Sequence, residues 1–276
     1  MRTGALVLGY DPEVPEHEES STERNTPHKR QRFWEVDAAR GVAILMMVAY
    51  HLTYDLDTFG GYNIESTSGF WAWFADATAS AFLFLVGVSL SISYSRATAG
   101  GTGRGLFWKY LRRGLRILAY GMALTIISLA LGMGIIAFGI LHVIGVSVIL
   151  AYPLLKYRLP NLFLGVSIIA LGAYMKVRDV SSESPWLLPF GFVPENLFMP
   201  DYRPLLPWFG VVLLGLFAGN VVYGDGKRPA RLAQRTPAVA RQLVPLGRHS
   251  LFIYLIHQPI LVALLAGLGI VELGRF

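Results

Sequence analysis

Long apolar segments alternate with short polar ones along most of this chain. An α-helix needs about 20 apolar residues to cross a hydrocarbon core of about 30 Å. The apolar segments that reach or approach this length are 37–57, 70–95, 106–131, 134–155, 160–177, 204–223 and 248–270. They are too long and too continuous for the strands of a β-barrel, whose apolar positions alternate. The sequence therefore predicts an all-α polytopic membrane protein with about seven transmembrane helices.

Composition agrees with this prediction and separates a tail from the membrane domain. Hydrophobic residues make up 54% of the chain and charged residues 15%, whereas soluble domains average about 25% charged residues. Residues 1–32 are polar and contain three prolines, so we expect a disordered cytoplasmic tail. Residues 33–276 form the predicted transmembrane domain. We expect an integral, multi-pass protein of the cell membrane, with the lipid bilayer as its surroundings.

The distribution of positive charge predicts the orientation of the chain. If the N-terminus is cytoplasmic, the tail and the inner loops hold all 24 Lys and Arg residues except Lys176, Arg178, Arg203 and Arg275. The positive-inside rule then predicts a cytoplasmic N-terminus and an outer C-terminus. The net charge of +6 is explained by this orientation, so we expect no nucleic-acid partner.

Cysteine is absent from the chain. This excludes structural disulfides, an enzyme thiol that forms a thioester, and a metal site built on thiolates. We expect no metal ion.

The first crossing segment carries a polar stripe on an otherwise apolar helix. Arg40 and His51 are eleven residues apart, so they lie on one face and about 16 Å apart along the axis. That distance is about half of the hydrocarbon core, which places His51 near the midplane if Arg40 lies at the interface. Asp37 falls on the same stripe. Ionisable residues at such depth usually mark a site or a pathway, and a hydrogen bond from His51 to a neighbouring helix is the alternative.

Two further histidines are predicted at a similar depth on other helices. His142 lies roughly 12 Å from the outer end of the fourth segment, and His257 lies about 13 Å into the seventh. Three histidines at one depth on three helices predict a shared intramembrane site.

Arg112, Arg113 and Arg116 lie close to one face of the third segment, at its predicted cytoplasmic start. A helix N-terminus with several cations can bind phosphate groups, and anchoring at the lipid headgroups is an equally good explanation. On the other side of the membrane, the outer loop Arg178–Pro204 has a length and an aromatic content that suit a substrate lid, with an ordinary acidic surface loop as the alternative. Gly215 and Gly219 form a small-xxx-small pattern, which favours close helix packing.

Four motifs, in order, resemble the catalytic domain of the heparan-alpha-glucosaminide N-acetyltransferase family over about residues 34–265. These motifs are Asp37-Ala-Ala-Arg40-Gly-Val-Ala-Ile with His51, Phe82-Leu-Phe-Leu-Val-Gly-Val-Ser, Gly139-Ile-Leu-His142, and Leu246-Gly-Arg-His-Ser-Leu-Phe-Ile-Tyr-Leu-Ile-His257. The spacing of Arg40 and His51 is also similar to the signature of Arg, ten residues and His in the related acyltransferase-three family.

The resemblance implies acyl transfer from cytoplasmic acetyl-CoA to an amine or hydroxyl of a sugar or lipid-linked glycan on the outer side. His51 would be the base or a transient acyl carrier, because imidazole titrates near neutral pH. The other candidate catalytic residues are Asp37, Arg40, His142 and His257. The candidate residues for binding CoA are Arg40, Arg112, Arg113, Arg116, Arg248 and Ser250. The candidate hydrogen-bond donors to the thioester oxyanion are Ser250, Tyr254, Gln258 or the other histidines. A homo-oligomer is compatible with the sequence.

Two alternatives come from other functional classes. A proton-coupled transporter also uses intramembrane His, Asp and Arg residues, but the chain shows no matching halves, and seven crossings do not divide into two equal repeats. A membrane scaffold without chemistry leaves three histidines at mid-depth without a role.

Overall fold

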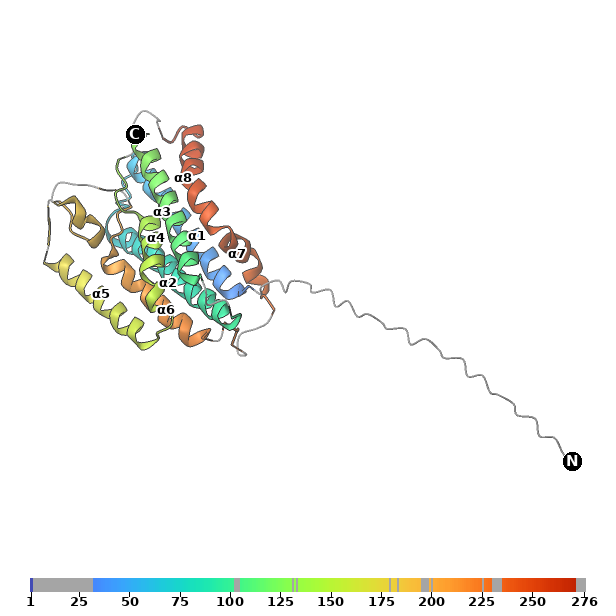
Figure 1. Cartoon of the computed structure of the whole chain (residues 1–276). Helices are drawn as coiled ribbons and strands as arrows, with labels where there is room; N and C mark the ends of the chain where they lie inside the picture. The colour runs from blue at the N-terminus through green and yellow to red at the C-terminus, as the bar shows by residue number, and fades with distance from the viewer. Residues whose placement is uncertain are drawn as a thin grey trace. The chain divides into compact units, whose positions relative to one another are not determined.

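The computed structural model describes residue 1 and residues 32–271, apart from 102–104, 131, 133, 179, 183, 195–198, 200, 225 and 230–234. The predicted tail 1–32 therefore lies almost entirely outside the described residues. In the described part, the chain forms helices joined by loops, with no β-strand (Figure 1). The helices are α1 Trp34–Thr58, α2 Gly69–Ala99, α3 Leu106–Ala130, α4 Ile140–Leu150, α5 Leu159–Val177, α6 Leu205–Val222, α7 Ala238–Arg248 and α8 Ser250–Gly267, with short 3-10 helices η1 Tyr152–Leu154 and η2 Pro185–Phe190.

Six of these helices are long and apolar enough to cross a membrane: α1, α2, α3, α5, α6 and α8. The prediction of an all-α polytopic membrane protein is confirmed. The fourth predicted crossing is shorter than expected, because α4 has 11 residues and spans only about 16 Å. Before it, Gly132 and Gly134 have φ values of 72° and 89°, which are left-handed conformations that suit glycine and end regular helix. After it, Pro153 belongs to the 3-10 turn η1.

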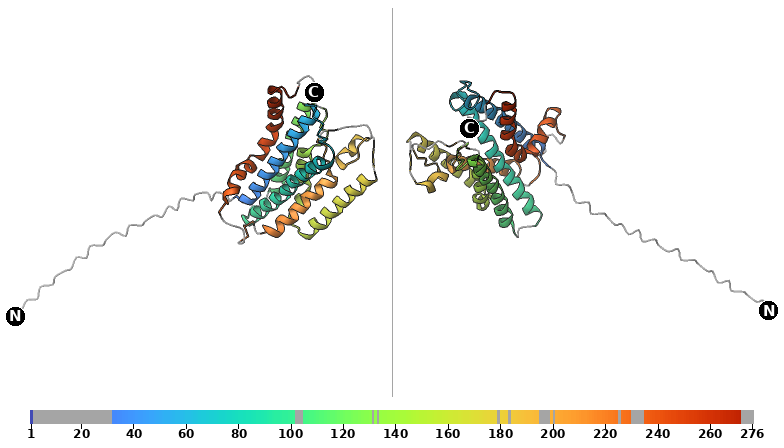
Figure 2. Two further views of the ribbon diagram at one scale, coloured as in Figure 1. Left: turned by 180° about the vertical axis from the view of Figure 1, so that it is seen from behind. Right: turned by 90° about the horizontal axis from the view of Figure 1, so that it is seen from above.

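The bundle is built around the contact between α2 and α6, with α5 on the outer side of α6 and α1 beside α8 (Figures 1 and 2). The backbones of α2 and α6 approach closely. A Cβ atom at Gly87 would overlap the carbonyl oxygen of Val212, and one at Gly215 would overlap that of Phe84. The close packing predicted for Gly215 is confirmed.

Polar side chains also hold the bundle together between helices. Ser91 of α2 donates to the Asn220 side chain of α6 at 2.5 Å. The Asn220 amide in turn donates to the carbonyl oxygens of Leu155 and Tyr157, at 3.2 and 2.8 Å. These bonds satisfy buried polar groups that would otherwise be unpaired in an apolar interior.

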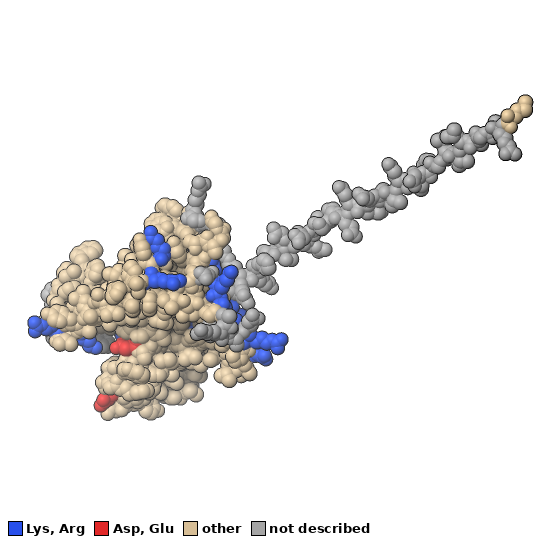
Figure 3. All heavy atoms as spheres, turned by 90° about the horizontal axis from the view of Figure 1, so that it is seen from below, with Lys and Arg blue, Asp and Glu red and all other residues tan. Residues whose placement is uncertain are grey.

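One end of the bundle is rich in positive charge. Figure 3 looks at the end where α3 and α5 begin and α2 and α6 end, and Lys and Arg side chains are spread over this face. Exposed cations here include Lys109, Arg112, Lys156 and Arg158. This is the end that the sequence assigns to the cytoplasm, and the orientation itself stays a prediction.

Candidate functional site

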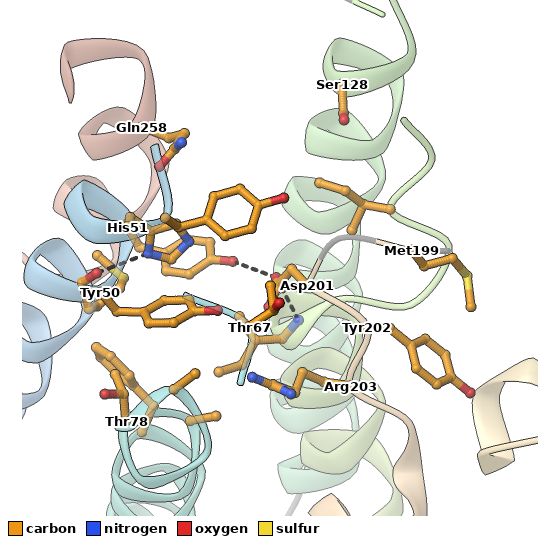
Figure 4. A pocket seen from close by; sticks show the side chains of 18 of the residues that line it. Tyr50, His51, Thr67, Thr78, Ser128, Met199, Asp201, Tyr202, Arg203 and Gln258 are labelled. Carbon is orange, nitrogen blue, oxygen red and sulfur yellow. Dashed lines mark hydrogen bonds between the residues drawn. The ribbon is translucent and has the colours of Figure 1, made fainter. Parts of the chain in front are cut away.

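A cavity of about 330 Å³ lies towards the other end of the bundle. Its walls come from the later part of α1, the first half of α2, the end of α3, the beginning of α4, and α8. Met199, Asp201, Tyr202 and Arg203, which precede α6, complete the walls. The polar groups that matter most are Tyr50, His51, Asp201, Arg203, Tyr254 and Gln258. Figure 4 shows the side chains of Asp201 and Arg203 pointing into the space that His51 and Tyr50 face from α1.

His51 lines this cavity, and the ring of His257, which is not itself a lining residue, packs against His51. Their ring centroids are 4.7 Å apart and the rings are nearly perpendicular, at 80°. His51 Nδ1 lies 2.9 Å from the carbonyl oxygen of Met47, and His257 Nδ1 lies 2.7 Å from that of Tyr254. A carbonyl oxygen can only accept, so Nδ1 carries the hydrogen in both rings. The neutral rings therefore keep the lone pair on Nε2, which is the form that a general base requires.

His142 has the opposite arrangement and does not line the cavity. It is buried in the first turn of α4, where its Nδ1 accepts the backbone N–H of Gly139 at 3.2 Å. A neutral ring with this acceptor carries its hydrogen on Nε2. Its neighbours include Gly121 of α3 and the Phe138 ring. The predicted meeting of three histidines therefore holds for His51 and His257 only, because α4 begins at Ile140 and His142 is its third residue rather than a residue midway along a long helix.

Asp37 and Arg40 lie at the opposite end of α1 from the cavity. Asp37 is buried and accepts from Arg40 at 3.3 Å and from Arg248 of α7 at 3.5 Å. Arg40 also donates to Ser89 of α2. Fourteen residues separate Asp37 from His51, about 21 Å along the helix axis. The structure therefore joins Asp37, Arg40 and Arg248 in one ion-pair cluster and keeps this cluster apart from His51.

The remaining residues predicted to bind CoA lie towards the cationic end. Arg112 and Arg116 are exposed on α3, Arg113 is half-buried, and Ser250 is the first residue of α8. Within the described residues, none of them lines the cavity around His51. Any CoA contact with these residues would thus involve a part of the bundle that is distinct from the cavity.

Asp201, in the segment before α6, forms hydrogen bonds to α4 and α8 at the cavity. It was not identified as a site residue from the sequence. Its Oδ2 atom accepts the backbone N–H of Ile140 and the Tyr254 hydroxyl, both at 3.3 Å. Burial raises the pKa of the Asp201 carboxyl above its ordinary value, and the nearby charge of Arg203 opposes this shift.

Arg203 is the other charged group that the sequence did not identify as part of a site. It pairs with Asp76 of α2 at 3.2 Å and lies over the Trp208 ring at 5.0 Å. Its Nε atom is buried without a partner among the described residues. The sequence offered one signal for these two residues, because the outer loop Arg178–Pro204 was proposed as a substrate lid. The last residues of this loop bring the charged side chains of Asp201 and Arg203 to the cavity wall.

The cavity thus combines the imidazole of His51, against which His257 packs, with a carboxyl group and a guanidinium group. In the part of the chain that the structure describes, no three His, Cys, Asp or Glu side chains gather as metal ligands. This set can remove a proton from an incoming amine or hydroxyl and can hold a polar substrate.

A family comparison decides between the functional classes. The model of heparan-alpha-glucosaminide N-acetyltransferase, catalytic, matches residues 32–259. The chain belongs to this family. The match runs from the residues before α1 to the residues just after His257, so it includes the whole cavity. Membership in the heparan-alpha-glucosaminide N-acetyltransferase family indicates a transferase, and with the six apolar helices it indicates a membrane acetyltransferase. Comparisons with curated proteins and with solved structures found no match.

Proposed function

We propose that this protein transfers an acetyl group from cytoplasmic acetyl-CoA to an amine or hydroxyl of a sugar or lipid-linked glycan on the outer side of the membrane. The observation that carries the proposal is the imidazole of His51 at the cavity, held through Nδ1 with Nε2 free and packed against the ring of His257. This arrangement supplies a base at a depth that substrates could approach from either side of the bilayer.

The chemistry requires one proton to move from the acceptor and one bond to break in the donor. The acceptor nitrogen or oxygen attacks the thioester carbonyl carbon, and His51 Nε2 takes its proton. The C–S bond then breaks and the CoA thiolate leaves, to be protonated as the thiol. In a two-step variant, Nε2 of His51 first receives the acetyl group and then passes it to the acceptor. Both routes need the free Nε2 atom.

Cations at the cytoplasmic end would hold the phosphate groups of CoA. Arg112, Arg113, Arg116, Arg248 and Ser250 are the candidates, because this face is cationic (Figure 3). Arg40 and Arg248 already share Asp37, and Arg40 also donates to Ser89, so we give these two arginines a supporting role. The double variant Arg112→Glu with Arg113→Glu should weaken CoA binding at least about tenfold and leave acceptor binding unchanged. Correct insertion with unchanged CoA affinity would make these residues lipid anchors.

The deciding experiment measures acetyl transfer from labelled acetyl-CoA by protein purified in lipid nanodiscs, with a panel of amino sugars and neutral sugars as acceptors. His51→Ala should lower the rate by about 10³-fold or more, because it removes the base. His28→Ala is the matched control in the N-terminal tail and should have the wild-type rate. Acid quenching in the absence of acceptor shows whether label stays on the protein, as the two-step route requires.

Two results would overturn the proposal. One is an active His51→Ala variant. The other is wild-type protein that does not bind acetyl-CoA but catalyses proton-dependent uptake of a solute into vesicles, which would favour a transporter.

A further inference from the structure

Asp55 is a fully buried acidic residue near the histidine pair, and the mechanism above does not use it. It lies one turn after His51 on α1, with none of its surface exposed. Its Oδ1 atom accepts from the Gln258 side-chain amide of α8 at 2.6 Å. Among the described residues no cation pairs with Asp55, and the titratable side chains nearest in sequence on these two helices are His51, Tyr54, Asp57, Tyr254 and His257.

The other oxygen atoms of this pair lack partners. Asp55 Oδ2 and Gln258 Oε1 are both buried without a hydrogen bond to any described group. If Asp55 were ionised, both atoms would be acceptors with no donor, and an unpaired carboxylate would lie inside a membrane helix. That state costs several kcal/mol. A single hydrogen on Oδ2 removes both problems, because a carboxylic acid can donate to the amide oxygen while it accepts from the amide N–H.

We propose that Asp55 carries a proton in the folded protein and forms a two-bond acid–amide pair with Gln258 that keeps His257 against His51. Asp55 is thus a positioning residue. The catalytic part of this inference rests on the proposed function, whereas the protonation of Asp55 does not.

The pair suits this role because it lies beside the histidine contact on the same two helices. Asp55 follows His51 by four residues, so both side chains leave the same face of α1. Gln258 follows His257 directly in α8. The ring contact and the acid–amide pair come from adjacent turns of α1 and from consecutive residues of α8. Together they resist sliding or rotation of α8 relative to α1. Small displacements of a base lower a reaction rate strongly.

The first test is spectroscopic and does not depend on activity. Infrared difference spectra of wild-type protein minus Asp55→Asn, recorded at neutral pH, should show a protonated carboxyl C=O band that only the wild type has. Asp57→Asn is the matched control, since the Asp57 carboxylate accepts the backbone N–H groups of Ile64 and Ser66 at 3.0 and 2.7 Å. It should remove no such band. If Asp55→Asn removes a carboxylate band instead, Asp55 is ionised and the inference is wrong.

The second test compares two substitutions at the same position. Asp55→Ala removes the partner of Gln258 and should lower the maximal acetyl-transfer rate at least about tenfold. Asp55→Asn can donate an N–H to Gln258 Oε1 and accept at Oδ1, so the rate should return to within about threefold of wild type, with an unchanged pH profile.

Equal losses in both variants would show that an ionisable carboxyl takes part in the chemistry and would contradict a positioning role. If wild-type protein shows no acetyl transfer at all, the proposed function fails, and the infrared result still decides whether Asp55 is protonated.

Discussion

The two ends of α1 carry similar polar residues and use them in opposite ways. At the beginning of α1, Asp37 is shared by two arginines, and Glu35 pairs with Arg228 at 2.6 Å. Each acidic side chain there is neutralised by a cation from α1, from α7 or from the loop between α6 and α7. Near the end of α1, His51 faces a cavity, and the His257 ring that packs against it has a buried Nε2 atom with no hydrogen-bond partner among the described residues.

The residues of α1 that hold helices together thus lie apart from the residues of α1 that are proposed to take part in the reaction. Ion pairs with low exposure hold segments together but leave no atom free to react with a substrate. Free lone pairs and N–H groups at a cavity contribute little to stability, and they are what binding and proton transfer require. We therefore expect substitutions at the cavity to change rates and substitutions at the ion-pair cluster to change stability.

The largest expected effect is on the rate at the cavity end. His257→Ala should lower acetyl transfer about 10²-fold or more, because His51 loses the ring that packs against it and fixes its position. Its unfolding midpoint should fall only modestly. Steady-state rates and thermal unfolding in the same nanodiscs check this, and a rate close to wild type would remove His257 from the site.

The next largest expected effect is a loss of stability at the beginning of α1, where α7 packs against it. Gly247 of α7 lies so close to α1 that a Cβ atom would overlap the Asp37 carbonyl oxygen. Gly247→Val should destabilise the protein by about 3 kcal/mol by forcing α7 away from α1. Gly267→Ala is the control, since a Cβ atom there meets nothing within 4 Å. Equal unfolding midpoints for the two variants would contradict the packing of α7 on α1.

A smaller loss of stability is expected at the ion-pair cluster. Asp37→Ala leaves Arg40 and Arg248 without their shared carboxylate and should cost about 2 kcal/mol, less than in a dry interior because the Arg248 side chain is 47% exposed. Activity per folded molecule should change less than about threefold. A loss of tenfold or more in well-folded protein would show that Asp37 serves the reaction, as the family resemblance implies.

The smallest effect is a change in pH dependence at the cavity. Burial raises the pKa of Asp201, so the folded state binds its proton more tightly than the unfolded state. The contribution of Asp201 to stability is therefore lost as pH rises above about 4. The asparagine in Asp201→Asn cannot ionise, so this variant lacks the pH-dependent contribution of Asp201 to stability. Its stability relative to wild type should therefore improve from pH 4 towards neutral pH, as measured by chemical unfolding. Parallel stability curves would contradict the raised pKa.

The membrane fold was largely predictable from hydropathy. A bilayer requires long apolar helices whatever their partners, so six of the seven predicted crossings match helices of the right length. The fourth crossing was overestimated because apolar composition does not show where the backbone bends at Gly132 and Gly134. The spacing of Arg40 and His51 along α1 also followed from the constant rise of an uninterrupted helix.

The sequence by itself determined the class of protein, the family, and the position of His51 along α1, because these depend on local composition and on regular helical geometry. Only the tertiary structure decided which groups surround His51. It brought His257, but not His142, into contact with His51. It brought Asp201 and Arg203 to the cavity from a loop about 150 residues away. It placed Asp37 and Arg40 in a separate ion-pair cluster. The physical reason is that partners across helices depend on how each helix is rotated and packed against its neighbours, which arises from contacts spread over the whole chain.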